Sequence, residues 1–555
     1  MSDWDQFPQS SEGPWEKLAR VAVPGAAFDS PERQPHPKCL EGTRKDLLKC
    51  IYGLLDDRKK SRLIWLHGTA GVGKSAVAFT VAERMRDLKV TKETNVETRL
   101  AGTFFFSRKH TNRSTTGHLF ATLAYQLARN FPSVRNDVNR AIRENPAVLN
   151  PNQSLRDQMM ALFRQPLWHL ECRQRENLPP VFVVDALDEC KPETVGDLIF
   201  LLGQVLRNPN LPVIHILLTS RSEDHIRAAI QKDEMRPLVY EIPVNTSGEG
   251  IAATISLDGA DVDNDICMFL QHSFTELQSR RPDFPQPTAH ELELLASRAG
   301  RRFIVASTMM KFIDDGYNDP RNRLELLLRL TSELLPGTEV YKLYDRILST
   351  CADPVRAHLH LSIVAALADP LPISQISKLL GPGQGKDVEA TLVQLRSIVD
   401  IPTNSNLPLN IYHSSVRDYV SDPSNCKVPQ VQSQQCIMSP HSLLAESSFS
   451  LMARDIPKST ALLDALSELK GHNQATQTDD PKSLQQSLAF VVEPPEPLKI
   501  LVGLLWLRGA RRPKAGMTIC GHRGGKTGWR PRAGGVGWKP TRGMFGCRPR
   551  EGKSG

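Results

Sequence analysis

Apolar positions along residues 39–245 follow two different spacings. Short apolar runs predict five buried strands: Leu63–Leu66, Gly102–Ser107, Val181–Val184, Val213–Leu218 and Leu238–Val244. Between these runs, apolar residues recur every three or four positions, as they do from Leu47 to Leu55. Because buried strands alternate with helices, the pattern predicts an α/β fold with a mostly parallel sheet covered on both faces.

The pattern changes twice after residue 245. Helical spacing dominates residues 246–350, and in the next segment three helices precede two extended stretches, Leu409–Ser414 and Arg417–Val420. That order suggests a small winged-helix unit. The pattern therefore divides the chain into an irregular start (1–38), a sheet domain (39–245), a helical domain (246–350), a winged-helix-like domain (351–425), a helical segment (426–500) and a basic Gly/Arg-rich tail (501–555). The tail has no apolar periodicity, so we expect it to be disordered.

The first predicted strand leads into Gly68-Thr-Ala-Gly-Val-Gly-Lys-Ser75, which fits the P-loop pattern G-x-x-x-x-G-K-[ST]. Its glycines let the backbone N–H groups curl around a phosphate, and the helix that follows adds its positive N-terminal end. Lys74 is expected to reach the terminal phosphates, and the Ser75 hydroxyl to bind Mg²⁺. The predicted nucleotide-binding residues here are Gly68, Gly71, Val72, Gly73, Lys74, Ser75 and Ala76.

Polar residues follow two further predicted strands, where parallel strands place ligands. Asp185 ends one strand and is expected to hold Mg²⁺ with Ser75, through water. Asp188 or Glu189 is predicted to orient an attacking water, and Arg221 to contact the γ-phosphate. The alternatives are a solvated helix start for the acidic residues and a surface ion pair for Arg221.

Charge is unevenly distributed along the 555 residues. The formal net charge is +8, but residues 508–555 hold 13 Lys/Arg and one acidic residue, which leaves 56 basic against 60 acidic residues elsewhere. The N-terminus has no apolar signal segment and no apolar run is long enough to span a bilayer, so we expect no membrane contact. Ten scattered cysteines without a C-x-x-C pair favour reduced thiols in the cytoplasm.

These motifs together resemble NACHT NTPases of the STAND class of signalling switches, in the fungal branch related to the nephrocystin-3-like N-terminal domain. The resemblance spans roughly residues 22–460. Beyond the P-loop it rests on segments at Val184–Glu189, Leu218–Arg221, Cys39–Arg44, Phe104–Arg108, Leu123–Leu127, Phe303–Ala306, Leu343–Leu348, Pro370–Ile373 and His413–Tyr419. It implies that residues 39–245 are a NACHT nucleotide-binding domain, followed by helical and winged-helix domains.

The resemblance also implies roles for single residues. His413 matches a winged-helix histidine that contacts the β-phosphate of ADP, and Thr43-Arg44 matches a segment near the base. The alternatives are an ordinary strand histidine and, for Thr43, simple helix capping. Arg301-Arg302 and Ser222 depart from the pattern, and no 33- or 40-residue repeat is visible after the winged-helix-like domain.

The favoured function is a nucleotide-dependent signalling switch, in fungal self/non-self recognition or defence, with slow Mg²⁺-dependent hydrolysis of ATP or GTP. Its expected partners are the nucleotide, other copies of the chain in the triphosphate state, and a trigger and effector protein that the sequence does not identify. One alternative is an active ATPase remodeller. Another is a nucleic-acid-binding regulator that uses the winged helix and the basic tail. The acidic third helix of the winged-helix-like domain disfavours it, because phosphate contacts need clustered cations.

Overall fold

The computed structural model describes residues 13–88, 99–171, 178–244, 259–329, 339–433 and 439–455. The chain divides into two units, Met1–Leu505 and Trp506–Gly555. The whole second unit, all of the predicted basic tail (501–555) and residues 456–500 of the predicted helical segment lie outside the described residues. Among the described helices, none combines the length and the apolar character needed to cross a membrane.

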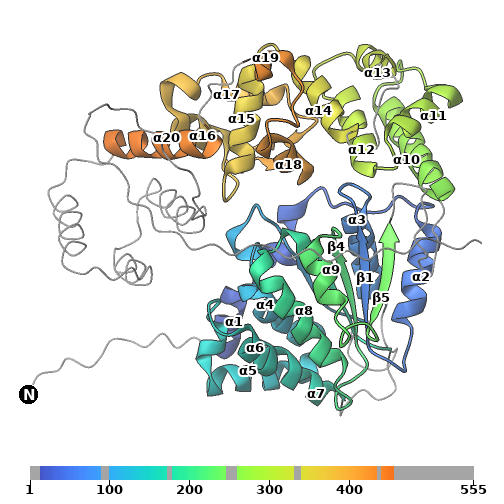
Figure 1. The fold of residues 1–555 in the computed structure, drawn as a ribbon, viewed down its shortest axis with the longest axis vertical. Helices are drawn as coiled ribbons and strands as arrows, with labels where there is room; N and C mark the ends of the chain where they lie inside the picture. Colours follow the sequence, from blue (N-terminus) through green and yellow to red (C-terminus); the bar gives the residue numbers. More distant parts are fainter. Residues whose placement is uncertain are drawn as a thin grey trace, which may run out of the picture. The chain divides into compact units, whose positions relative to one another are not determined.

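A five-stranded parallel sheet forms the centre of the N-terminal half (Figure 1). Its strands are β1 (Arg62–Gly68), β2 (Leu100–Phe105), β3 (Val181–Asp185), β4 (His215–Ser220) and β5 (Val239–Val244). They lie in the order β2-β3-β4-β1-β5, so the P-loop strand β1 is an inner strand. All five predicted strands are confirmed, with boundaries shifted by at most two residues.

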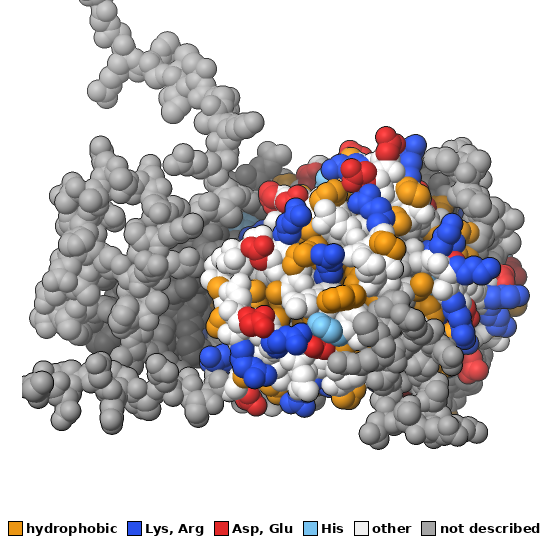
Figure 2. All heavy atoms as spheres, turned by 90° about the horizontal axis from the view of Figure 1, so that it is seen from below, with side chains coloured by type: hydrophobic (Ala, Val, Ile, Leu, Met, Phe, Trp, Pro, Cys, Tyr) orange, Lys and Arg blue, Asp and Glu red, His pale blue; other side chains and the backbone are white. Residues whose placement is uncertain are grey.

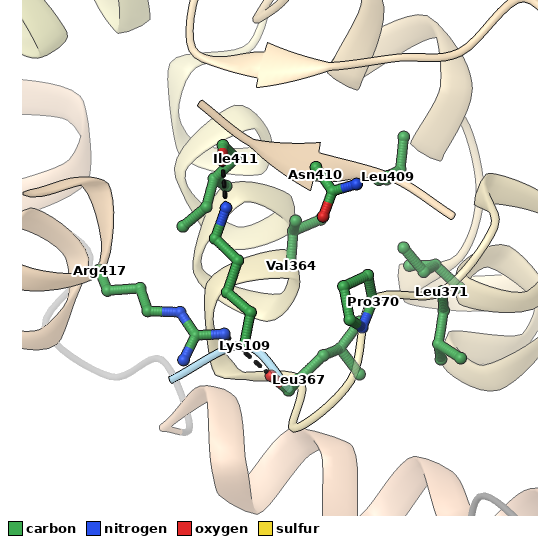
Figure 3. A pocket seen from close by; sticks show the side chains of 10 residues that line it. Lys109, Val364, Leu367, Pro370, Leu371, Leu409, Asn410, Ile411 and Arg417 are labelled. Carbon is green, nitrogen blue, oxygen red and sulfur yellow. Dashed lines mark hydrogen bonds between the residues drawn. The ribbon is translucent and has the colours of Figure 1, made fainter. Parts of the chain in front are cut away.

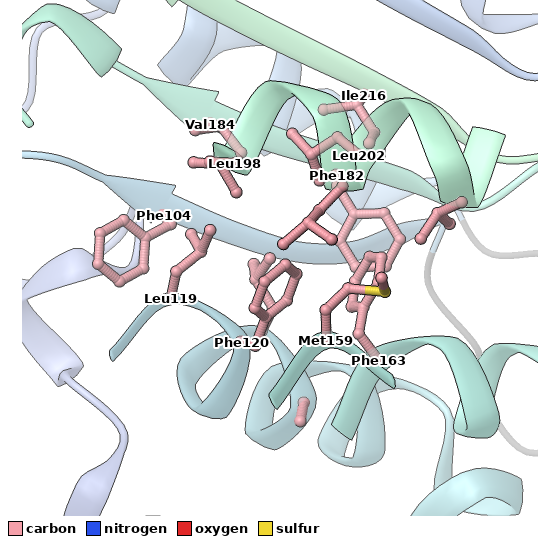
Figure 4. Close-up of a cluster of buried hydrophobic side chains, with 14 of the residues drawn as sticks. Phe104, Leu119, Phe120, Met159, Phe163, Phe182, Val184, Leu198, Leu202 and Ile216 are labelled. Carbon is pink, nitrogen blue, oxygen red and sulfur yellow. The ribbon is translucent and has the colours of Figure 1, made fainter. Parts of the chain in front are cut away.

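Both faces of the sheet are buried, as the continuous apolar runs predict. In β1, Leu63 and Trp65 join a core that includes α4 (Leu119–Asn130) and α8 (Pro192–Leu206), whereas Ile64 and Leu66 join a core with α2 and α3. This alternation follows from the two-residue period of a strand. The first core is dense in aromatic side chains, with Phe163 against Phe182 at 4.8 Å between ring centroids (Figure 4). These layers establish an α/β P-loop NTPase fold.

Further helices complete this half of the chain. They are α2 (Lys45–Leu55), α3 (Lys74–Asp87), α5 (Arg135–Glu144), α6 (Leu155–Gln158), a π-helical turn at Met159–Arg164, α7 (Gln165–Glu171) and α9 (Asp224–Ile230). The predicted cap of α2 is wrong: its N-cap is Arg44 in the left-handed region, and the Thr43 hydroxyl donates to the Leu40 carbonyl oxygen at 2.7 Å.

The segment predicted to be irregular contains a helix, α1 (Pro14–Val21). Leu18 is fully buried in the core that contains α4, and the Trp15 ring stacks on Tyr125 of α4 at 4.8 Å. Pro14 provides a helix start, since a first-turn proline costs no hydrogen bond. Trp15, Leu18 and Val21 recur at helical spacing, but this short run lies among prolines and charged residues, and the prediction of an irregular segment is wrong here.

The second half is helical. We call α10–α14 the helical region: α10 (Gly259–Arg280), α11 (Ala289–Arg298), α12 (Phe303–Ile313), α13 (Pro320–Leu328) and α14 (Glu339–Ser349). The C-terminal region comprises α15 (Pro354–Ala366), α16 (Ile373–Gln384), α17 (Val388–Val393), β6 (Val399–Asp400), β7 (Asn410–Ile411), α18 (Ser415–Ser421), α19 (Pro429–Gln432) and α20 (Pro440–Asp455). One apolar core contains residues of both regions.

The C-terminal region differs from the prediction in two places. Arg417–Val420, expected to be extended, lies within α18, because Val416 and Tyr419 are buried at helical spacing. Val399, expected on a helix, pairs with Ile411 in the antiparallel β6–β7 ribbon. The three predicted helices are present as α15, α16 and α17, and they are followed by the two-stranded ribbon. The description of these elements as a winged helix stays a prediction.

Candidate functional site

The P-loop has the backbone that its glycines permit. β1 ends at Gly68, α3 begins at Lys74, and Gly71 and Gly73 adopt φ of +82° and +91°. Such φ values strain any residue with a Cβ atom. The predicted order of strand, loop and helix is therefore confirmed, with Gly73 as the N-cap of α3.

Lys74 lies across the loop. Its ammonium donates to the carbonyl oxygens of Gly68 and Thr69 at 2.9 and 3.0 Å. Burial lowers the pKa of Lys74, and the carboxylates of Asp188 and Asp185 oppose that shift. A phosphate group fits here because its oxygens offer the same ammonium stronger, charge-assisted acceptors.

Asp185 is held from the neighbouring strand. The Thr219 hydroxyl at the end of β4 donates to Asp185 Oδ1 at 2.5 Å and accepts from the Ala186 N–H at 3.0 Å. Burial raises the pKa of Asp185, while the bonds from Thr219 and Ser75 favour its charged form. A carboxylate and a hydroxyl in contact are a donor set that would suit Mg²⁺, and Ser75 and Asp185 are the residues that could hold it.

Thr219 is the site residue that sequence reasoning missed. Its position at a strand end was visible, but its partner was not, because only the strand order brings β4 beside β3. The bond also holds Ala186 at φ +56°, a left-handed conformation rare for alanine. Thr219 is thus a positioning residue for the carboxylate of Asp185 at the end of β3.

We expect Thr219→Val to lower the free energy of unfolding by about 1–3 kcal/mol, since it leaves the buried Asp185 and the Ala186 N–H without this partner. It should also weaken Mg²⁺-dependent ATP binding. Thermal unfolding and ATP titrations with and without Mg²⁺ test both effects. Thr275→Val, which removes an exposed hydroxyl bonded only within α10, is the control. Equal stability of both variants would contradict this role.

The two acidic residues after β3 contact different arginines: Asp188 contacts Arg221, and Glu189 contacts Arg108. Asp188 is buried; its Oδ1 accepts from the Arg221 N–H at 2.9 Å and its Oδ2 lies 3.1 Å from Arg221 Nε. Glu189 Oε2 accepts from the Arg108 N–H at 3.1 Å. Burial and then the nearby Asp188 carboxylate raise the pKa of Glu189. Both carboxylates lie at the carboxyl edge of the sheet, near Lys74.

Arg221 connects this edge to the C-terminal region. Besides Asp188, its guanidinium donates to Asp418 Oδ2 at 2.7 Å and to Ser414 Oγ at 3.2 Å. It is therefore no isolated surface ion pair. Its partners are thus the Asp188 and Asp418 carboxylates and the Ser414 hydroxyl, and a γ-phosphate could replace such a carboxylate.

His413 lies just before α18, near the same charges. Its Nδ1 accepts from the Ser415 N–H at 3.1 Å. Burial lowers the pKa of His413 to about 3, and the nearby cations of Arg221 and Lys74 act in the same direction. The imidazole is thus neutral at pH 7 and near the P-loop lysine. Sequence reasoning left open a strand histidine, but the ring is in fact fixed at a helix start.

Arg44 fastens the P-loop to the helical region. Its Nη2 donates to the Val72 carbonyl oxygen at 2.7 Å, and its backbone N–H donates to Asp265 Oδ2 on α10 at 3.0 Å. The guanidinium also lies 5.0 Å from the centroid of the Phe303 ring. Arg44 thus contacts the loop from outside; Thr43 beside it is buried.

The first turn of α12 packs on the P-loop. The Ile304 N–H donates to the Gly71 carbonyl oxygen at 3.1 Å. A Cβ atom on Gly71 would lie 2.0 Å from Ile304 Cγ2, so the close approach requires glycine here. The departure from the family pattern at Arg301-Arg302 falls immediately before this contact.

A loop after β2 inserts into the C-terminal region (Figure 3). Lys109 donates to the Ile411 carbonyl oxygen at the mouth of a pocket whose apolar lining includes Val364 and Leu371. Arg417 donates to the Leu367 and Arg108 carbonyl oxygens, each at 3.2 Å. Burial lowers the pKa of Lys109 to about 7. The pocket is small, and both of its cations, Lys109 and Arg417, are already bonded to carbonyl oxygens. These bonds therefore connect the loop after β2 to the C-terminal region.

Away from this edge the surface is mixed. On the face in Figure 2, Lys and Arg side chains are interspersed with Asp, Glu and apolar side chains. Interspersed charges of both signs are typical of a solvent-exposed surface.

Comparison with known proteins gives a family match for the sheet half. Residues 42–221 match the family described as nephrocystin 3, N-terminal. This range contains every predicted phosphate-, metal- and water-contacting residue from Gly68 to Arg221. A search of curated proteins found no match.

Solved structures of low similarity include three archaeal proteins. A STAND protein with a tetratricopeptide repeat sensor from Pyrococcus horikoshii has 13% identity and a TM-score of 0.38, covering 85% of this chain and 57% of that protein. A Walker-type ATPase of Pyrococcus abyssi has 15% identity and a TM-score of 0.34, and the match covers 70% of this chain and 99% of that protein. Cdc6p from Pyrobaculum aerophilum has 14% identity and a TM-score of 0.30, and the match covers 71% of this chain and 98% of that protein. The chain thus spans little more than half of the first protein's length.

Proposed function

We propose that this protein is a nucleotide-controlled switch of the STAND type, in which the C-terminal region detects the phosphates held by the P-loop. The observation that supports it best is the position of Arg221, which contacts Asp188 at the sheet edge and Asp418 and Ser414 beside α18. One guanidinium thereby joins the predicted hydrolytic acids to the predicted winged-helix unit. The family match at residues 42–221 supports the nucleotide-binding part.

In the diphosphate state, His413 would donate to the β-phosphate while Arg221 keeps Asp418, and both contacts hold the C-terminal region closed. In the triphosphate state, Arg221 would exchange Asp418 for the γ-phosphate and release α18. Moving such an equilibrium from 1:99 to 99:1 requires about 10⁴-fold differential affinity, or about 5.5 kcal/mol. We propose that this difference in affinity comes from the exchange of Asp418 for the γ-phosphate at Arg221, together with the His413 contact to the β-phosphate.

Hydrolysis in this scheme resets the switch and is slow. Lys74 binds the phosphates, Ser75 and Asp185 hold Mg²⁺, which neutralises phosphate charge, and Asp188 or Glu189 orients water. The open form is proposed to associate with further copies of the chain in the cytoplasm. The setting implied by the resemblance is self/non-self recognition or defence in a fungus.

The direct test compares the protein with ADP, ATP and no nucleotide. Hydrogen exchange of the α18 amides should be slowest with ADP and fastest with a non-hydrolysable ATP analogue. Turnover should be far below about 1 s⁻¹, the low end for ordinary enzymes. Rapid turnover with unchanged exchange would favour a working ATPase and overturn the switch.

His413→Ala should shift the ADP-bound protein toward open, larger species, because it removes the proposed β-phosphate contact. Size-exclusion chromatography coupled to light scattering, with saturating ADP, measures this. His272→Ala changes a half-exposed histidine on α10 and is the matched control. An unchanged size distribution and ADP affinity for His413→Ala would remove His413 from the proposal.

A further inference from the structure

The ring of His413 is bonded to Ser415 in a way that determines which nitrogen carries the proton. The Ser415 backbone N–H donates to Nδ1 at 3.1 Å, and the Ser415 Oγ lies 2.8 Å from the same nitrogen. A backbone N–H has no acceptor capacity, so Nδ1 must be the unprotonated nitrogen. In the neutral ring the proton is then on Nε2.

A second hydroxyl fixes the direction of the serine bond. Tyr344 Oη on α14 lies 3.0 Å from Ser415 Oγ, and both residues are buried. If Ser415 donated to Tyr344, its oxygen lone pairs would face the lone pair of Nδ1. The favourable order is therefore Tyr344 O–H to Ser415 Oγ, and Ser415 O–H to His413 Nδ1. Burial raises the pKa of Tyr344, so the phenol keeps the proton that this order needs.

The charges around the ring also oppose a second proton. The cations that act on His413 come from four elements: Arg221 after β4, Lys74 at the start of α3, Lys109 in the loop after β2, and Arg302 before α12. Protonating Nδ1 would add a fifth positive charge and turn the ring N–H toward the Ser415 N–H. The local geometry and the surrounding charge thus favour the same neutral tautomer.

We infer that Ser415 and Tyr344 are positioning residues that keep His413 as an uncharged hydrogen-bond donor, with Nε2–H available to a phosphate oxygen of bound nucleotide. The inference rests on the proposed function and extends it to two residues that do not touch the nucleotide. It also gives a role to Leu343-Tyr344, a segment that resembles the family but has no part in the phosphate site. Tyr344 on α14 thereby connects the helical region, through Ser415, to the His413 ring in the C-terminal region.

The test is a double-mutant cycle on ADP affinity in the full chain, measured by isothermal titration calorimetry. Ser415→Ala and Tyr344→Phe should each weaken ADP binding about three- to tenfold, the equivalent of one net hydrogen bond. Neither should weaken it further in a His413→Ala background, because both act through that ring. Ser421→Ala removes a hydroxyl at the other end of α18, bonded to the Arg417 carbonyl oxygen, and should have no effect.

The pH profile tests whether the ring is uncharged. Burial lowers the pKa of His413 to about 3, and Ser415→Ala keeps the backbone N–H that donates to Nδ1, so the ring should stay neutral in this variant. The Ser415→Ala defect should therefore be the same at about pH 8 and at about pH 5.5, and a defect that shrinks at the lower pH would show an imidazolium and overturn the inference.

Each outcome has a distinct meaning. If His413→Ala leaves ADP affinity unchanged, the histidine contact in the proposed function fails. If His413→Ala weakens binding but Ser415→Ala and Tyr344→Phe do not, the function stands and the positioning role is overturned. Additional loss in the His413→Ala background would show a structural effect that does not act through the ring and would also overturn the positioning role.

Discussion

Lys74→Ala is expected to lower the affinity for ATP and for ADP by about 100-fold or more. The ammonium now bonds two P-loop carbonyl oxygens and would exchange them for phosphate oxygens. A hydrogen bond to a charged group contributes about 1.5–3 kcal/mol, and two such bonds suffice for this loss. Calorimetric titration with ATP and ADP measures the change.

The variant should remain folded, because alanine favours the helix that starts at this position. Lys60→Ala, an exposed lysine just before β1, provides the control of equal charge. Near-normal affinity in Lys74→Ala, with thermal stability intact, would contradict the phosphate site on which the rest depends.

Asp418→Asn is expected to open the protein without removing any predicted nucleotide ligand. The substitution keeps the size of the side chain but removes the charge that holds Arg221 Nη1 at 2.7 Å. Since both side chains are largely shielded from solvent, the loss of about 1.5–3 kcal/mol should raise the open population about 10- to 100-fold.

Two measurements check it. With ADP bound, amide exchange in α18 should accelerate, and with ATP the protein should form larger species at lower concentration. Asp422→Asn removes the same charge four residues on, where the carboxylate is exposed and bonds the Ser424 N–H, and should change neither. Wild-type exchange in Asp418→Asn would mean that Arg221 does not hold the C-terminal region closed.

The sheet could be predicted from sequence because strands β1 to β4 are buried along nearly their whole length, whereas the edge strand β5 leaves side chains such as Glu241 exposed. A run such as Val181–Val184 has few alternatives, and the P-loop fixes where the strand before it ends. What sequence could not supply is which strand ends are neighbours. The Thr219–Asp185 bond depends on β4 lying beside β3, and no local pattern encodes that order.

The errors near the C-terminal region have a different cause. Residues 415–421 form a single short helix, and a segment that short contains too few apolar positions to separate helical from extended spacing. Arg44 shows the same limit at long range, because its partner Asp265 is 221 positions away in the chain. The family resemblance directed attention to Arg44, but not to the loop carbonyl and carboxylate that it contacts.

The bond between Thr219 and Asp185 has a mechanical consequence. Thr219 lies in β4 and Arg221 directly follows that strand, and they contact Asp185 at the end of β3 and Asp188 in the turn after it, respectively. A displacement of Arg221 by α18 would therefore reach Thr219, and through it the Asp185 carboxylate, after only two peptide bonds. In the proposed switch, coupling between α18 and the predicted metal ligand therefore needs no route through the hydrophobic interior.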